Sequence, residues 1–289
     1  MKPFLKWAGG KSALLPILRE KSAQMLGYPL GSPSFKGRYF EPFLGGGALF
    51  FDQQPKRATL SDLNTELVAT YAAVRDEPAA LLALIETMPY AKEAYYAVRA
   101  ADRQDGFQRL PEVWRAARFV YLNKCGYNGL YRVNSRGEHN VPFGAYKNPL
   151  APVRDDVEAA HKALQRTTVK AMGFIEASSL ANAGDFVYFD PPYKAMPNTS
   201  NFTAYTADGF DMKEHRKLAQ CFHQLTTKGV HVMASNSAHP GIRALYEKEC
   251  KQAEIITVSA PRRIGANAAS RSSVEEFLIT SKLKAARRE

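Results

Sequence analysis

The residues best suited to chemistry are Asp190, Pro191, Pro192 and Tyr193, which follow the apolar run at 186–189. An unbroken run of β-branched and aromatic residues predicts a strand that is buried on both faces. Two prolines cannot continue a strand ladder, because they lack an N–H and have a fixed φ. We therefore predict a stiff turn at the carboxyl end of this strand, the edge at which open α/β sheets bind ligands. A rigid surface turn is the alternative interpretation.

A turn of this kind suits a flat, polar guest such as adenine. The N6 amine of adenine is a poor nucleophile, because its lone pair is delocalised into the ring. Asp190 and the backbone carbonyl of Pro191 can each accept one N–H, which draws the nitrogen toward tetrahedral geometry and aims its lone pair at an electrophile. Tyr193 can stack on the base. An adenine in duplex DNA must first be flipped out of the helix.

A second candidate is the glycine-rich sequence FLGGG at 43–47, which follows a predicted strand. Glycines allow a tight turn and a close approach of a nucleotide-like ligand to the backbone. No Gly-Lys-Ser/Thr follows, and Phe50 stands where a dinucleotide fingerprint has its third glycine, so a ligand without phosphate is favoured. Asp62 ends the next predicted strand and can accept hydrogen bonds from ribose hydroxyls. Alternatively, Asp62 caps the helix that follows.

These groups need an α/β sheet to position them. The chain alternates apolar runs with helical patterns, except for a helical stretch at 63–124 and a segment rich in glycine, proline and asparagine at 125–149, which we predict to be a β-hairpin or an extended loop. A helix is predicted at 211–229, with Asp211 and Glu214 in cap spacing and Gly229 at its end. Strands are predicted at 39–44, 57–62, 167–174, 185–189, 230–237, 254–261 and 274–282. The prediction is therefore an α/β sheet domain interrupted by a helical insert at roughly 65–152.

Composition narrows the class of partner. The chain has 289 residues, 45% of them hydrophobic, which is enough for a sizeable core. Its net charge of +11 (39 − 28) favours a polyanionic partner, nucleic acid before membrane. The three cysteines are far apart, so neither a zinc site nor a disulfide framework is expected. With no signal peptide and no apolar run near 18 residues, we expect a cytosolic protein.

Six blocks together resemble one known family, the DNA adenine N6-methyltransferases of the Dam type (D12 class, alpha group). The resemblance covers nearly the whole chain, in the family's motif order. The blocks are FLKWAGGK at 4–11, EPFLGGG at 41–47, SDLN at 61–64, NKCGYNGLYRVNSRGEHNVPFG at 123–144, GDFVYFDPPY at 184–193 and NFTAYT at 201–206.

The resemblance implies a fold, a cofactor and a reaction. The fold is α/β: a Rossmann-like class I methyltransferase sheet, in two parts at 1–64 and 153–289, with an inserted helical DNA-recognition domain and β-hairpin at 65–152. S-adenosylmethionine supplies the methyl group, and N6 of adenine takes it directly, with no covalent enzyme intermediate and no metal. The residues implied to bind the cofactor are Trp7, Gly10, Lys11, Phe43, Gly45, Gly47, Asp62, Phe174 and Asp190. The catalytic residues are Asp190, Pro191, Pro192 and Tyr193.

The same resemblance assigns the DNA contacts. Tyr127, Asn128 and Leu130 correspond to a hairpin tip that enters the base stack. Further implied contacts are Lys6, Arg132 and Pro142 to base edges, and Lys147 to phosphate. We also predict that a basic loop with Arg262, Arg263 and Arg271 contacts phosphates; a solvated surface is the alternative for any one arginine. The family's usual target is GATC, and we expect double-stranded DNA as partner and a monomeric, cytoplasmic protein in a bacterium or phage.

Two alternatives remain open. The first is an amino methyltransferase acting on another target sequence. The second is a DNA-binding protein that keeps the fold without activity. Asp190 as the first residue of the turn favours adenine, because asparagine is typical of enzymes that act on protein glutamine and serine of enzymes that act on cytosine N4.

Overall fold

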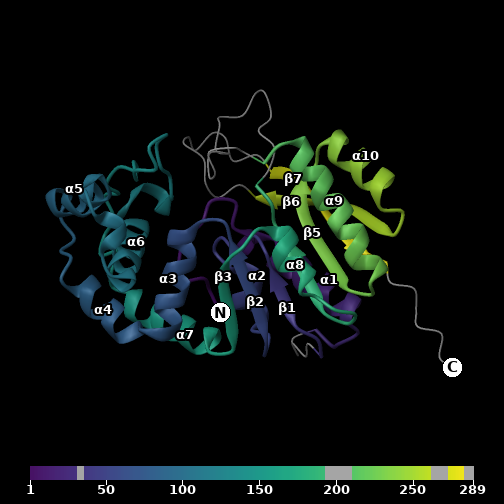
Figure 1. Ribbon diagram of the computed structural model, residues 1–289, viewed down its shortest axis with the longest axis horizontal. Helices are drawn as coiled ribbons and strands as arrows, with labels where there is room; N and C mark the ends of the chain where they lie inside the picture. Colours follow the sequence, from purple (N-terminus) through teal and green to yellow (C-terminus); the bar gives the residue numbers. More distant parts are fainter. Residues whose placement is uncertain (31–35, 193–209, 262–272, 283–289) are drawn as a thin grey trace.

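Figure 1 shows a computed structural model of the chain, which describes residues 1–30, 36–192, 210–261 and 273–282. The strands among these residues are β1 (Tyr39–Glu41), β2 (Ala58–Asp62), β3 (Thr167–Ala171), β4 (Phe186–Phe189), β5 (His231–Ser237), β6 (Ala253–Pro261) and β7 (Ser273–Ser281). The α-helices are α1 (Leu15–Leu26), α2 (Ala48–Gln53), α3 (Thr65–Asp76), α4 (Pro78–Glu86), α5 (Lys92–Ala100), α6 (Glu112–Cys125), α7 (Val153–Leu164), α8 (Phe174–Ser179), α9 (Met212–Thr227) and α10 (Pro240–Glu249).

The strands form one sheet in the order β3-β2-β1-β4-β5-β7-β6. The strands β1 to β5 are parallel, whereas β7 is antiparallel to β5 and β6. The predicted α/β class is therefore confirmed. The chain order reverses between β1 and β4, and the crevice outside the carboxyl ends of two such strands is where open sheets bind ligands.

Both faces of the sheet are buried, as the apolar runs predict. Along β4, Phe186 and Tyr188 lie in one hydrophobic core with side chains of α1, α2 and α3. Val187 and Phe189 alternate with them and lie in a second core with side chains of α8, α9 and α10. The period of two along a strand sends successive side chains to opposite faces, so a strand between two helical layers must be apolar throughout.

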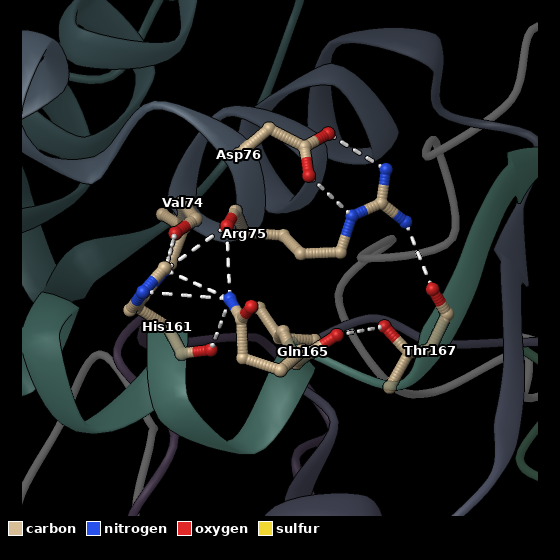
Figure 2. A network of polar contacts seen from close by, with 7 residues as sticks. Val74, Arg75, Asp76, His161, Gln165 and Thr167 are labelled. Carbon is tan, nitrogen blue, oxygen red and sulfur yellow. Dashed lines mark hydrogen bonds and ion pairs between the residues drawn. The ribbon is translucent and has the colours of Figure 1, made fainter.

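The helices α4, α5 and α6 lie to one side of the sheet, and α3 lies between them and β2 (Figure 1). A polar network fixes the carboxyl end of α3 (Figure 2): the guanidinium of Arg75 pairs with Asp76 and donates to the carbonyl oxygen of Thr167 in β3 at 2.9 Å. Nδ1 of His161 in α7 lies 2.9 Å from the carbonyl oxygen of Arg75, and Nε2 of Gln165 donates to the same oxygen. The helix α3 is thus tied to the sheet and to α7, although the predicted insert begins with it. The domain boundaries at 64 and 152 stay predictions.

The segment 125–149 is an extended loop with little regular pairing. Two isolated antiparallel bridges, Gly126 with Phe143 and Val133 with His139, hold its two limbs together. A turn closes its tip, where the side-chain oxygen of Asn134 accepts the N–H groups of Arg136 and Glu138. The chain turns back on itself as in a hairpin, but it does not form the two strands of a regular β-hairpin. Of the two predicted alternatives, the extended loop is therefore the one observed.

Other expectations differ in detail. The strand predicted to end at Phe174 stops at Ala171, and Phe174 begins α8 instead. The strand predicted at 39–44 stops at Glu41, because Pro42 cannot donate to the ladder. The helix predicted at 211–229 is confirmed, and the carboxylate of Asp211 accepts the N–H groups of Lys213 and Glu214. The helices α1, α7, α8 and α10 were not predicted from the sequence. Over the described residues, no helix combines the length and apolarity that a bilayer span requires.

Candidate active site

The candidate site lies where β1 and β4 end. The glycine loop at 43–47 follows β1, and Asp190 follows β4, so parallel pairing of the two strands brings both to the same edge of the sheet. Pro191 is buried and Pro192 is half-buried, and the stiff turn expected there stays a prediction. Tyr193, the last residue of the predicted turn, lies outside the described residues, as do Arg262, Arg263, Arg271 and the block at 201–206.

Asp190 is held by a lysine from the amino-terminal segment. Nζ of Lys11 lies 2.9 Å from Oδ1 of Asp190 and 3.7 Å from Oε2 of Glu276, and it donates to the carbonyl oxygen of Gly9 at 2.8 Å. Lys11 is only 5% exposed, whereas the Asp190 side chain keeps 19% of its surface in contact with solvent. The carboxylate is therefore anchored on one side and accessible on the other, as a group that accepts a hydrogen bond from a ligand must be.

Burial raises the pKa of Asp190 to about 6; Lys11 opposes the rise, and the negative charge of Glu276 adds to it. At neutral pH the carboxyl group is mostly ionised and accepts hydrogen bonds only. Burial raises the pKa of Glu41 to about 8; the 2.7 Å hydrogen bond from the hydroxyl of Tyr39 opposes the rise, and the negative charge of Asp190 adds to it. Glu41 therefore keeps its proton at neutral pH, which avoids a further negative charge near Asp190.

This arrangement predicts a pH dependence. The catalytic role predicted for Asp190 needs the ionised carboxylate, so we expect kcat/KM of the predicted methyl transfer to fall as the pH drops through about 6. In Lys11→Met, loss of the ammonium raises the pKa of Asp190, and the acid limb of the profile should move to higher pH. In Glu276→Gln, loss of a negative charge lowers the pKa of Asp190, and the limb should move to lower pH. The check is kcat/KM between pH 5 and 9 for all three proteins. Shifts of both variants in the same direction would contradict the assignment.

Asp62 organises the glycine loop. Its Oδ2 accepts the N–H of Gly45 at 3.0 Å, and its Oδ1 accepts the N–H of Asn64 at 3.0 Å. The alternative in which Asp62 caps the next helix is wrong, because the N-cap of α3 is Asn64, whose side chain accepts the N–H of Leu67. Burial raises the pKa of Asp62, and the backbone N–H groups of Asn64, Gly45 and Leu63 oppose the rise. The two carboxylate oxygens together offer about four acceptor positions, so a ribose hydroxyl can still be bound.

Trp7 covers this loop. A Cβ on Gly45 would lie 2.7 Å from Cδ1 and Nε1 of the indole, and Gly45 has a φ of +45°. Two independent reasons therefore require glycine: close approach of a side chain and a left-handed backbone. The indole also stacks on Tyr131 at 5.8 Å, with an interplanar angle of 18°. The predicted cofactor segment and the predicted DNA loop thus touch each other, which the sequence analysis did not foresee.

An aromatic and apolar surface continues beside the loop. Phe43 stacks on Phe174 with ring centroids 5.4 Å apart, and both contact Phe210. Leu63 and Ile175, which directly follow Asp62 and Phe174, are large apolar side chains left 61% and 53% exposed. Sequence reasoning missed both, although a leucine directly after the acidic end of a predicted strand was a readable signal. Exposed apolar groups beside a polar anchor are typical of a ligand surface.

The predicted DNA-contacting residues lie along the loop and the amino-terminal segment. Most are exposed: Lys6, Tyr127, Arg132, Pro142 and Lys147. Asn128 is half-buried, with a φ of +55°. Leu130 is buried, so its predicted insertion into a base stack would require it to leave this position. Nε of Arg132 donates to Oδ1 of Asn140 at 2.6 Å, which preorganises its guanidinium.

The strand order, with the glycine loop, Asp62 and Asp190 at the ends of β1, β2 and β4, defines the class: a Rossmann-like methyltransferase fold. A family model described as D12 class N6 adenine-specific DNA methyltransferase matches residues 7–264. The chain belongs to this family, and its cofactor is S-adenosylmethionine.

Named relatives align along almost the whole chain. The type II methyltransferase M1.LlaDCHI of Lactococcus lactis subsp. cremoris is 40% identical over 97% of this chain and 95% of its own length. The DNA adenine methylase of Escherichia coli K12 is 34% identical over the same shares of the two chains. Among solved structures, that of SMU.776 complexed with SAH has a TM-score of 0.38 and 12% identity, and the match covers 91% of this chain and 49% of that one.

Proposed function

We propose that the chain is an active DNA methyltransferase that modifies N6 of an adenine flipped out of duplex DNA, with GATC as target. The observation that carries the proposal is Asp190, ionised at neutral pH, anchored by Lys11 and adjacent to the glycine loop. S-adenosylmethionine supplies a methyl group on a positively charged sulfur. The protein's task is to hold the amine so that its lone pair faces that group.

The residues at the end of β4 hold the amine. Asp190 accepts one N–H of the adenine N6 group, and the carbonyl oxygen of Pro191 accepts the other. Drawing the two N–H groups apart in this way localises the nitrogen lone pair, which is otherwise spread into the ring. The proline corner keeps the two acceptors at a fixed spacing, because φ cannot change at either proline. Tyr193 is proposed to stack on the flipped base.

The residues that would hold the cofactor fit it chemically. Asp62 offers lone pairs for ribose hydroxyls while its other bonds fix the glycine loop. Leu63 and Ile175 leave apolar side chains exposed near Asp62, which suits an adenine ring, and Phe174 lies buried behind them against Phe43. The ammonium of Lys11 lies beside Asp190 and offers a positive charge to the carboxylate of the cofactor's methionine part. The other residues proposed to bind the cofactor are Trp7, Gly10, Phe43, Gly45 and Gly47.

The DNA surface supports a duplex substrate. The exposed cations Lys6, Arg132 and Lys147 lie on the amino-terminal segment and on the loop at 125–149, and the chain carries a net charge of +11. We propose that Lys6, Arg132 and Pro142 contact base edges, that Tyr127, Asn128 and Leu130 occupy the space near the displaced base, and that Lys147, Arg262 and Arg263 contact phosphates. We propose a monomer that acts in the cytoplasm, the compartment of bacterial DNA.

One assay tests this function. Purified protein is incubated with labelled S-adenosylmethionine and unmethylated plasmid, which is then digested with nucleases that distinguish methylated from unmethylated GATC. The expected result is label in DNA and protection of GATC sites. Label without GATC protection would keep the activity and reject the target. Absence of label would favour the alternative, a DNA-binding protein of the same fold without activity.

Replacing Arg132 by alanine tests the base contact. A side chain that donates two hydrogen bonds to a base edge is worth about 1–3 kcal/mol of discrimination, so Arg132→Ala should lose about 10–100-fold in preference for GATC over sites changed at one base pair. Lys147→Ala is the matched control, because loss of a phosphate contact weakens binding to all sequences about equally. The measurement is kcat/KM on GATC and on singly substituted duplexes. Unchanged selectivity in Arg132→Ala would reject the contact.

A further inference from the structure

Asn123, near the carboxyl end of α6, joins two segments that are far apart in the sequence. It is buried, and its amide makes three hydrogen bonds. Oδ1 accepts the N–H of Lys6 at 2.9 Å, and Nδ2 donates to the carbonyl oxygens of Lys6 and Gly129 at 2.8 and 2.9 Å. Both donor positions of the amide and one acceptor position are used, so its orientation is fixed.

The two segments face different ligands under the proposed function. The backbone of Lys6 leads directly into Trp7, whose indole lies against Gly45 in the glycine loop. Gly129 lies in the turn Tyr127–Gly129, which carries residues proposed to contact the flipped base. A buried amide that bonds both backbones keeps them within hydrogen-bond length of one side chain, so displacement of one segment must displace the other or break a buried bond.

Side-chain contacts reinforce this junction. The indole of Trp7 stacks on Tyr131, which stacks on Phe119 of α6 at 4.9 Å. The Lys6 side chain lies against Gly129, where a Cβ would come within 2.5 Å of the Cδ atom of Lys6. Glycine is therefore required at 129 for the same two reasons as at 45, close contact and a φ of +61°.

A small cavity lies between α6 and the loop. Its volume of about 10 Å³ has room for about one water molecule, and its lining includes Asn123, Leu130, Tyr131 and His139. Nδ1 of His139 is buried and has no hydrogen-bond partner within the described ranges. Other bonds also hold the loop: the hydroxyl of Tyr95 donates to the carbonyl oxygen of Val141 at 3.0 Å, and the carboxylate of Asp102 accepts the N–H of His139 at 2.7 Å. Asn123 differs from these contacts because it also bonds the backbone of Lys6.

We propose that Asn123 is a positioning residue that couples the cofactor side of the site to the DNA side. The inference rests on the proposed function, because it assigns one ligand to each segment. A change at the glycine loop moves Trp7, Trp7 moves the backbone of Lys6, and Asn123 transmits the movement to Gly129. Coupling between two sites is reciprocal, so each ligand must change the affinity for the other by the same factor.

The test measures that factor. The dissociation constant of S-adenosylhomocysteine, which cannot donate a methyl group, is measured with and without a GATC duplex; the ratio of the two constants is the coupling factor. For the unaltered protein we expect a factor of about fivefold or more. For Asn123→Ala we expect a factor near 1. Asn123→Asp is isosteric and keeps the acceptor for the N–H of Lys6 but loses both donors. The coupling factor of this variant should therefore also fall. If the alanine variant does not fold, Asn123→Asp tests the coupling in its place.

Asp185→Ala is the matched control. Asp185 is also a buried side chain that joins distant segments, accepting the N–H groups of Arg38 and Asn182, but it lies at the opposite end of β4. It should lower the melting temperature and leave the coupling factor unchanged. A factor near 1 in the unaltered protein, or an unchanged factor in the Asn123 variants, would overturn the inference. Methylation of plasmid by the unaltered protein is measured in parallel. Methylation with a coupling factor near 1 rejects only the role of Asn123. Absence of both methylation and binding of S-adenosylhomocysteine rejects the proposed function as well.

Discussion

Replacing Asp190 by alanine should nearly abolish methyl transfer, lowering its rate by about 10²–10³-fold, while DNA binding remains near that of the unaltered protein. The carboxylate is proposed to accept an N–H of the reacting amine, and removal of one preorganised hydrogen-bond partner of a reacting group typically costs about 10²–10³-fold. Its removal also leaves the buried ammonium of Lys11 without its 2.9 Å partner. DNA affinity rests on cations elsewhere on the surface. The measurements are single-turnover methylation and duplex binding by the same preparation.

The two ends of β4 supply a control for this experiment. Asp185 precedes the strand and Asp190 follows it, and both are aspartates paired with a cation: Asp185 with Arg38 at 2.8 Å, and Asp190 with Lys11. The guanidinium and the backbone N–H groups around Asp185 hold its pKa below the usual value against the effect of burial. Asp185→Ala should therefore reduce stability, yet leave kcat per folded molecule unchanged. Turnover close to normal in Asp190→Ala would remove the basis of the proposed function.

Gly45→Ala should weaken binding of S-adenosylmethionine by about 10–100-fold. A left-handed φ costs an alanine roughly 1–2 kcal/mol, and the added Cβ would lie 2.7 Å from the indole of Trp7, so the ring must move. Both changes distort the loop whose N–H is bonded to Asp62. The affinity is measured by titration calorimetry in the absence of DNA.

Gly27→Ala separates backbone strain from the local contact. Gly27 ends α1 with a φ of +67°, and a Cβ there would meet nothing within 4 Å. It should cost roughly 1 kcal/mol of stability, as any left-handed glycine does, and leave cofactor affinity unchanged. Equal cofactor affinities in Gly45→Ala and Gly27→Ala would show that the glycine loop is not part of the cofactor site.

The local features of the fold were readable because they depend on neighbouring residues. The apolar run at 186–189 required burial on both faces, and Pro191 required the strand to end where it does. Asp211 with Glu214 indicated the start of α9. One wrong prediction also had a local cause. Phe174 was assigned to a strand, because an aromatic residue at the end of a β-branched run favours a strand. In the structure Phe174 begins the short helix α8 and stacks on Phe43.

The sequence by itself determined the class of sheet, the end of β4 before the two prolines, the glycine loop and which residues are candidates for the site, because each of these depends on residue types at fixed short spacings. Only the tertiary structure decided which distant groups meet. The pairing of Lys11 with Asp190 and Glu276 joins three separate parts of the chain, and Asn123 joins Lys6 to Gly129. Contacts of this kind depend on the path of the chain through the folded protein, and no local pattern of residues encodes them. Burial in that fold likewise raises the pKa of Asp190 to about 6.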